Sequence, residues 1–78
     1  MKLAVYTKPG CPYCDKIKQV FTAKGWNYAE YVLDRDFNRN QFYSQFGEGA
    51  TFPRVISDDL LLGGCTESIN YFRSKGLL

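Results

Sequence analysis

The first half of the 78-residue chain alternates between short apolar runs and one long amphipathic segment. Residues 2–6 and 28–33 are rich in aliphatic and aromatic side chains, a composition that is typical of strands. Between these runs, apolar side chains recur at helical spacing, which predicts a helix over residues 13–24. Gly25 follows as a natural helix stop. The apolar positions of this predicted helix are Tyr13, Ile17, Val20 and Phe21.

A second helix is predicted before Gly47, but its beginning is poorly marked. Either Asp34 or Asp36 can cap it, because a short carboxylate side chain accepts hydrogen bonds from the free N–H groups of a first helical turn. Residues 38–40 are poor helix formers, so the pattern does not define the first turn. The side chains that we expect to face the core are Phe42, Tyr43 and Phe46.

The last third of the chain predicts a hairpin followed by a helix. Residues 52–56, with a proline at their entrance, and residues 60–62 have the composition of two strands. The two aspartates at 58–59 favour a tight turn between these strands. The glycines at 63–64 interrupt the second strand, and helical spacing of apolar residues then predicts a helix over 66–75. The inward residues of this helix are Ile69 and Phe72.

These elements follow the order β-α-β-α-β-β-α. The strand–helix–strand start implies a right-handed crossover between parallel strands, and the hairpin adds an antiparallel pair. We therefore predict one α/β domain over residues 1–78, in which a four-stranded mixed sheet is flanked by three helices on its two faces. A hydrophobic content of 45% and an aromatic content of 17% are enough for one compact core.

Charge and hydropathy argue against several classes of function. The formal net charge is +2 with no run of like charges, so we expect no nucleic-acid partner. The longest apolar stretch, residues 60–62, is far too short to cross a bilayer, so we expect no membrane association. The first six residues carry one lysine and a short apolar segment, and no cleavage site of small residues follows. We therefore expect a reducing, cytoplasmic location.

Two cysteines, Cys11 and Cys14, are placed directly after the first predicted strand and at the start of the first predicted helix. At this spacing in a first helical turn, two sulfurs can close or open a small disulfide ring. The free N–H groups of a helix N-terminus favour a thiolate, so the pKa of a cysteine there falls below the free value of about 8.5. Lys8 adds positive charge nearby. The pattern predicts a redox-active pair, with Cys11 as the more exposed nucleophile and Cys14 as the more buried, resolving thiol.

The remaining potential ligands and thiols narrow the chemistry further. The chain has no histidine, which excludes Cys-His hydrolases, Cys₂His₂ zinc sites and c-type haem attachment. A zinc half-site is the alternative for Cys11 and Cys14, but only Cys65 and carboxylates remain as further ligands, so we expect no metal. An odd count of three cysteines also fits a catalytic pair better than a secreted disulfide scaffold. Cys65 is either a small packing residue or a secondary oxidation site.

Three motifs in order give the chain a family resemblance. They are Cys11-Pro12-Tyr13-Cys14 after the first strand, Thr51-Phe52-Pro53 before the third and Gly63-Gly64-Cys65 after the fourth. Over essentially its whole length the chain resembles the glutaredoxin family. The Pro-Tyr pair is similar to dithiol glutaredoxins rather than to thioredoxins, whose usual pair is Gly-Pro, and Cys14 separates the chain from single-thiol glutaredoxins. The resemblance implies a thioredoxin-like fold and a thiol–disulfide oxidoreductase, with glutathione as co-substrate and no permanently bound cofactor.

The resemblance also implies a glutathione-binding site. A lysine at the position of Lys8 typically contacts the glycine carboxylate, and the helix start after Gly64 holds the γ-glutamyl carboxylate. Glu67, where the family commonly has aspartate, can pair with the γ-glutamyl ammonium, although Thr66 and Glu67 can equally form a plain helix cap. Tyr13 either shapes the edge of the groove or packs. The implied contact residues are Lys8, Tyr13, Thr51, Phe52, Pro53, Gly64, Cys65, Thr66 and Glu67.

The Thr51-Phe52-Pro53 segment is similar to the family's Thr-Val-Pro, whose proline is cis. A cis bond would let Phe52 offer its backbone N–H and C=O to an extended peptide beside Cys11. Phe52 departs from the usual valine, and we expect its bulkier ring to narrow the groove. Two residues of the second predicted helix are weaker candidates for the glycine carboxylate, namely Arg39 and Gln41.

The implied partners are glutathione and disulfide-containing proteins, with ribonucleotide reductase as a family-level expectation, and the implied state is a monomer. Two alternatives stay open. One is a redoxin that a thioredoxin-type reductase reduces, although the Trp-Ser-Gly-Phe-Arg-Pro segment typical of redoxins dedicated to ribonucleotide reductase is missing. The other is a non-enzymatic dimer that bridges an iron–sulfur cluster through Cys11 and glutathione. Pro12 argues against it, because cluster-binding relatives usually lack that proline.

Overall fold

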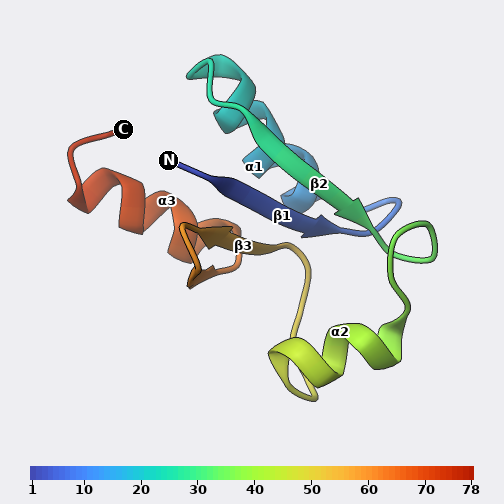
Figure 1. The fold of residues 1–78 in the computed structure, drawn as a ribbon. Helices are drawn as coiled ribbons and strands as arrows, with labels where there is room; N and C mark the ends of the chain where they lie inside the picture. The colour runs from blue at the N-terminus through green and yellow to red at the C-terminus, as the bar shows by residue number, and fades with distance from the viewer.

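The computed structural model describes residues 1–78 and confirms the predicted order of seven elements (Figure 1). Most boundaries lie within two residues of the predicted ones, and the second helix is the exception. None of the helices is long and apolar enough to cross a membrane. The elements are β1 (Leu3–Thr7), α1 (Pro12–Ala23), β2 (Tyr28–Val32), α2 (Arg39–Phe46), β3 (Arg54–Ser57), β4 (Leu60–Gly63) and α3 (Cys65–Ser74).

The four strands form one mixed sheet in the order β2-β1-β3-β4. Strand β1 pairs in parallel with β2 and antiparallel with β3, and β3 pairs antiparallel with β4. The parallel pair requires a crossover connection, which α1 provides, whereas the turn at Asp58 and Asp59 joins β3 to β4 directly. Both aspartates have positive φ angles, as tight hairpin turns need. The predicted topology is therefore confirmed.

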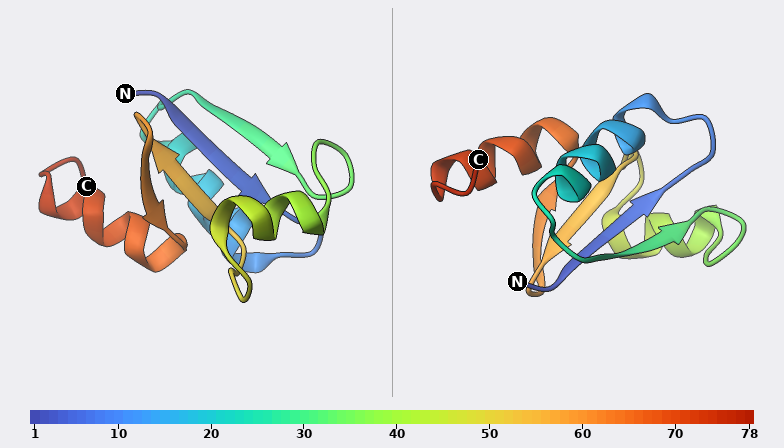
Figure 2. Two further views of the ribbon diagram at one scale, coloured as in Figure 1. Left: turned by 60° about the horizontal axis from the view of Figure 1, so that its bottom comes forward. Right: turned by 90° about the horizontal axis from the view of Figure 1, so that it is seen from above.

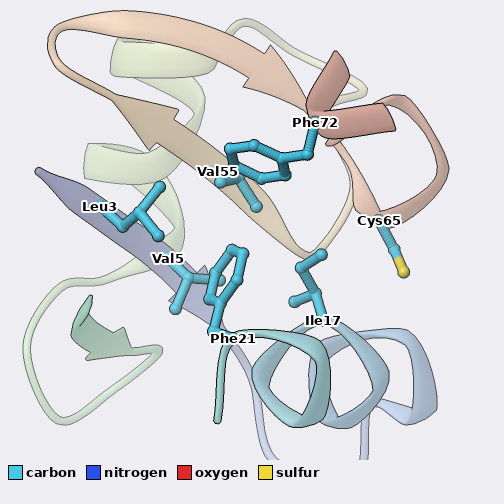
Figure 3. Close-up of a cluster of buried hydrophobic side chains, with 7 residues drawn as sticks. All are labelled: Leu3, Val5, Ile17, Phe21, Val55, Cys65 and Phe72. Atoms are coloured by element: carbon cyan, nitrogen blue, oxygen red, sulfur yellow. The ribbon is translucent and has the colours of Figure 1, made fainter. Parts of the chain in front are cut away.

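The helices cover both faces of the sheet, with α1 and α3 on one face and α2 on the other (Figure 2). Because side chains of a strand alternate between faces, Leu3 and Val5 of β1 point toward α1 and α3, whereas Tyr6 points toward α2. The buried side chains between the sheet and the α1–α3 layer form the main core (Figure 3). They are Leu3, Val5, Ile17, Phe21, Val55, Cys65 and Phe72.

A second, aromatic cluster fills the space under α2. The Tyr6 ring lies with its centroid 5.1 Å from that of Tyr31, 5.3 Å from that of Phe37 and 5.0 Å from that of Phe46. Phe42 is the buried residue of α2, with 1% of its surface exposed. Aromatic side chains thus attach the short helix α2 to the sheet, as expected from the inward positions predicted for Phe42 and Phe46.

The predicted cap of α2 is wrong. Asn38, rather than Asp34 or Asp36, is the N-cap: its side chain accepts a 2.8 Å hydrogen bond from the Gln41 amide, and the Gln41 side chain accepts a 2.8 Å bond from the Asn38 amide. This reciprocal capping box satisfies two N–H groups of the first turn. Asp36 instead accepts a hydrogen bond from the Val32 amide and ends β2. The helix therefore begins at Arg39, later than either aspartate predicted.

Two further details of the prediction need correction. Tyr13 occupies the first turn of α1 but does not face the core, because 61% of its surface is exposed and Cys14 takes the inward position. Strand β3 begins at Arg54 rather than at residue 52, because Pro53 has no N–H to donate to a neighbouring strand. Tyr13 and the segment Thr51–Pro53 line a surface groove.

Candidate functional site

The two predicted redox cysteines lie at the N-terminus of α1. Cys11 is the N-cap residue with extended backbone, Pro12 begins the helix, and Cys14 lies in the first turn. Proline suits that position because its missing N–H would have no helical partner. Cys11 and Cys14 form a disulfide in this structure, with their Cα atoms 5.2 Å apart. The Cys14 amide donates a 3.2 Å hydrogen bond to Cys11 Sγ, so the helix start solvates the sulfur that would carry the negative charge after reduction.

Both cysteines are buried, with 5% of Cys11 and 1% of Cys14 exposed. The order of exposure agrees with the prediction, but Cys11 is less accessible in the disulfide form than a surface nucleophile would be. Cys11 is thus the more exposed residue of a buried pair. This asymmetry is the geometric basis for assigning different roles to the two thiols.

A small groove of about 150 Å³ lies at this end of the molecule. It is formed by the first turn of α1, the loop before β3 and the start of α3. Of the residues that the family resemblance implies as glutathione contacts, all except Lys8 line it. The lining residues are Tyr13, Thr51, Phe52, Pro53, Gly64, Cys65, Thr66 and Glu67. The largest surface hollow, of about 530 Å³, lies between α1 and β2. Neither Cys11 nor Cys14 belongs to the lining of either hollow, and Tyr13, between them in the chain, is the residue of the pair's own turn that lines the small groove.

The loop before β3 is held from two sides. The Phe52–Pro53 peptide bond is cis, as predicted. Arg54 donates hydrogen bonds to Thr51, at 2.8 Å from Nε to the backbone oxygen and at 3.1 Å from Nη2 to Oγ1. On the other side the Phe52 ring stacks on Phe42, with centroids 4.1 Å apart and an interplanar angle of 13°. Arg54 and Phe42 therefore support the groove, although sequence reasoning assigned neither of them to the site.

The start of α3 forms the opposite wall of the groove. Gly64 is the N-cap, and its amide donates a 3.2 Å hydrogen bond to Glu67 Oε1. Gly63 has a φ of 108°, and a Cβ atom there would lie 3.1 Å from Glu67 Cβ, so this approach requires glycine. The helix-cap interpretation of Glu67 therefore holds in this structure. The Glu67 carboxylate caps the Gly64 amide, and the N–H groups that follow at the start of α3 have no side-chain cap.

Cys65 lies between the groove and the main core. It is a buried free thiol at the edge of the core cluster, and it also lines the groove (Figure 3). Burial raises the pKa of the Cys65 thiol above its ordinary value, and this effect exceeds the lowering by the charge of Lys16. A thiol with a raised pKa is a poor nucleophile near neutral pH. The structure thus favours the packing role for Cys65.

The remaining predicted contacts lie outside the groove lining. Lys8 is exposed, and its Nζ atom lies 5.7 Å from the centroid of the Phe52 ring. Arg39 is exposed at the start of α2, and the side-chain oxygen of Gln41 is engaged in the capping box with Asn38. Of these candidates, Lys8 alone contacts a residue of the groove through its charged end.

Comparison with known proteins agrees with this geometry. Residues 3–62 match the family model for glutaredoxin, which is more than half of the chain. The chain therefore belongs to the glutaredoxin family. Among curated proteins it is 33% identical over 70 residues to a hybrid peroxiredoxin, hyPrx5, of Haemophilus influenzae, and 33% identical over 67 residues to a probable glutaredoxin of Synechocystis. These alignments cover 90% and 85% of this chain but only 29% and 62% of the respective relatives.

Solved structures show the same thioredoxin-like fold. Glutaredoxin 1 from Francisella tularensis, complexed with cacodylate, superposes with a TM-score of 0.80 at 31% identity and covers 97% of this chain and 95% of its own. A buckwheat glutaredoxin–glutathione complex superposes with a TM-score of 0.81 at 27% identity, covering 96% and 71%. Family and fold support thiol–disulfide oxidoreductase chemistry at the Cys11–Cys14 pair.

Proposed function

We propose that this protein is a glutathione-dependent thiol–disulfide oxidoreductase that reduces glutathione mixed disulfides and protein disulfides. The observation that carries the proposal is the disulfide-forming pair Cys11–Cys14 at a helix N-terminus, together with a groove at the same end of the molecule. A disulfide that can form and open there exchanges two electrons with an external thiol or disulfide.

With a glutathione mixed disulfide, the Cys11 thiolate attacks the sulfur of the glutathione half. A Cys11–glutathione disulfide forms, the original sulfur–sulfur bond breaks, and the substrate leaves as a thiolate that takes a proton from water. The thiolate of a second glutathione then attacks the bound glutathione sulfur. This step releases glutathione disulfide and restores the Cys11 thiolate, which the Cys14 amide stabilises through its hydrogen bond.

With a protein disulfide, Cys14 completes the reaction. The Cys11 thiolate first forms a mixed disulfide with one sulfur of the substrate and releases the other as a thiolate. Cys14 then loses its proton and attacks Cys11 Sγ, which releases the second substrate thiol and leaves the Cys11–Cys14 disulfide. This is the oxidised state of the protein described above, and two glutathione molecules return it to the dithiol.

Glutathione is an anionic tripeptide, and the groove offers matching groups. The uncapped N–H groups at the start of α3, beside Thr66, suit the γ-glutamyl carboxylate. The Phe52 backbone suits the central peptide unit, and Lys8 suits the glycine carboxylate. Glu67 can face the γ-glutamyl ammonium, although its carboxylate also caps Gly64. The buckwheat complex supports glutathione as the ligand, because that protein binds it in the same fold.

The wider setting is also part of the proposal. We infer a cytoplasmic monomer with no permanently bound cofactor, acting on disulfide-containing proteins, with ribonucleotide reductase as one expected substrate. The similarity to hyPrx5 of Haemophilus influenzae adds a peroxiredoxin as a second substrate class to test, because that relative's name identifies it as a hybrid peroxiredoxin.

A turnover assay tests the proposal. The protein is given a small glutathione mixed disulfide, reduced glutathione, glutathione reductase and NADPH, and NADPH oxidation is followed. We expect sustained turnover. If NADPH oxidation occurs only when a thioredoxin-type reductase replaces glutathione and its reductase, the proposal is wrong and the chain is a redoxin of the alternative kind.

A further inference from the structure

The exposed Lys8 has one partner for its charge, and that partner is an aromatic ring. Its Nζ atom lies 5.7 Å from the centroid of the Phe52 ring, within the distance of about 6 Å at which a cation–π attraction is effective. The ion pairs of the protein involve Lys18 and Arg35, and none of them involves Lys8. The ring of Phe52 is therefore the one partner that the structure shows for the charge of Lys8.

That ring is itself fixed in place. Phe52 stacks on the buried Phe42 of α2, with an interplanar angle of 13°, and lies 6.1 Å from Phe37 in a second stacked pair. The backbone next to it is held by the two hydrogen bonds from Arg54 to Thr51. A ring held by these contacts has little freedom to turn, so the face that it offers to a cation is fixed.

We propose that Phe52 is a positioning residue for Lys8, holding its ammonium beside the groove so that anionic substrates approach Cys11 more readily than neutral ones. Lys8 precedes Cys11 by three residues, and Phe52 lines the groove. An aliphatic residue at position 52 would also line the groove but would offer no ring face to a cation. For glutathione, with its carboxylates, the inference rests on the proposed function.

The selectivity of Cys11 for charge can be measured without glutathione. The fully reduced protein is treated with iodoacetate, which is anionic, or with iodoacetamide, which is neutral and nearly the same size. The rate at Cys11 is followed by peptide mass, and the ratio of the two rates reports the positive charge near the sulfur. Low ionic strength is used because salt screens exposed charges.

The variants separate orientation of Lys8 from general damage to the site. We expect Lys8→Met to lower the iodoacetate-to-iodoacetamide ratio about two- to fivefold, the range that the loss of one exposed charge interaction implies. Phe52→Leu should lower the ratio in the same direction and by no more than Lys8→Met, because Phe52 acts only through the position of that charge. Phe52→Tyr keeps a ring face and retains the ratio. Phe46→Leu is the matched control, because Phe46 pairs with Tyr6 and Phe42 in the same aromatic cluster but forms neither a ring pair with Phe52 nor a cation–π contact with Lys8. A looser site changes both rates, so the ratio is insensitive to it.

The decisive comparison is the double variant. If Phe52 acts through Lys8, Phe52→Leu lowers the ratio in the wild-type background and has no further effect in the Lys8→Met background. An equal fall in both backgrounds, an unchanged ratio in Phe52→Leu, or a fall in Phe52→Tyr as large as in Phe52→Leu would overturn the inference. If Phe52→Leu does not fold, an unchanged ratio in Lys8→Met alone overturns it. Failure of glutathione turnover would refute the proposed function and leave this measurement intact.

Discussion

The ring of Phe52 lies almost parallel to the ring of Phe42, with the two centroids 4.1 Å apart. This contact joins the loop that lines the groove of about 150 Å³ to α2, which covers the face of the sheet opposite to α1 and α3 (Figure 2). The groove is therefore braced by an aromatic cluster that contains no redox-active residue. Substitutions in that cluster should therefore alter the groove as well as lower the free energy of unfolding.

Replacement of Phe42 tests this bracing. Phe42→Ala removes a buried ring, and we expect the free energy of unfolding to fall by about 3–5 kcal/mol. Gln45→Ala, at an exposed position of the same helix, should change it by less than about 0.5 kcal/mol. Chemical denaturation of both variants with the disulfide intact gives the comparison. Similar losses in the two variants would show that the ring is not part of a packed core.

Cys65 should be unreactive in the folded protein. In the oxidised state it is the only free thiol, and burial raises its pKa, so little thiolate exists at pH 7.5. We expect no alkylation by iodoacetamide in native buffer and one alkylation per chain in denaturant, as measured by intact mass. Rapid labelling of the native, oxidised protein would instead identify Cys65 as an accessible oxidation site.

An ion pair between α1 and β2 should make the free energy of unfolding depend on pH. Lys18 Nζ lies 2.9 Å from Glu30 Oε2, to which the Thr7 hydroxyl also donates a 2.8 Å hydrogen bond. Burial raises the pKa of Glu30, but the hydrogen bonds from Lys18 and Thr7 outweigh it, so the pKa lies below its usual value. The hydrogen bond to Glu30, opposed by burial, leaves the pKa of Lys18 raised.

The signs of these two shifts define a pH window. Because the folded pKa of Glu30 is lowered, its contribution is present above the unfolded pKa of about 4.3 and is lost as the pH falls through the folded value. Because the folded pKa of Lys18 is raised, its contribution is present below about pH 10.4 and is lost as the pH rises through the folded value. The pair therefore stabilises the fold most fully between these limits.

Glu30→Gln tests that window. We expect it to lower the free energy of unfolding by about 1 kcal/mol at pH 7, between the values for exposed pairs and for hydrogen bonds to charged groups. The difference from the wild type should shrink as the pH is lowered through the folded pKa of Glu30. Asp59→Asn is a suitable control, because Asp59 is exposed and has no ion pair. A difference that is equal at pH 7 and at low pH would refute the electrostatic origin of the effect.

The order of the elements could be predicted because most changes of hydrophobic period coincide with a glycine, a proline or a pair of adjacent aspartates. Gly25, Gly47 and the turn at Asp58 and Asp59 all lie where the structure ends a helix or reverses a strand. The start of α2 could not be predicted in the same way. Three short polar residues, Asp34, Asp36 and Asn38, are possible N-caps there. The reciprocal hydrogen bonds between Asn38 and Gln41 select Asn38, and these bonds form only when the helix has formed.

Much of the groove was also predictable, because short motifs carry it. The residues from Thr51 to Pro53 and from Gly64 to Glu67 come together with Tyr13, as the family resemblance implied. The side chains that support the groove, Arg54 and Phe42, could not be predicted. They act through side-chain contacts that no local sequence pattern contains. The one sequence feature that could have indicated this support is the arginine directly after the Thr-Phe-Pro motif. The burial of Cys11 was missed because it depends on packing around the disulfide.

The most direct test of Cys11 as the thiol that receives glutathione is to map the modified cysteine. Reduced wild-type, Cys11→Ser and Cys14→Ser proteins are treated with glutathione disulfide, and peptide mass locates any bound glutathione. We expect Cys14→Ser to carry one glutathione on Cys11 and to keep turnover of glutathione mixed disulfides while losing reduction of protein disulfides. Cys11→Ser should carry none and be inactive in both assays, because an alcohol supplies almost no anionic nucleophile at neutral pH. Glutathione bound to Cys14 in an active Cys11→Ser protein would contradict the assignment.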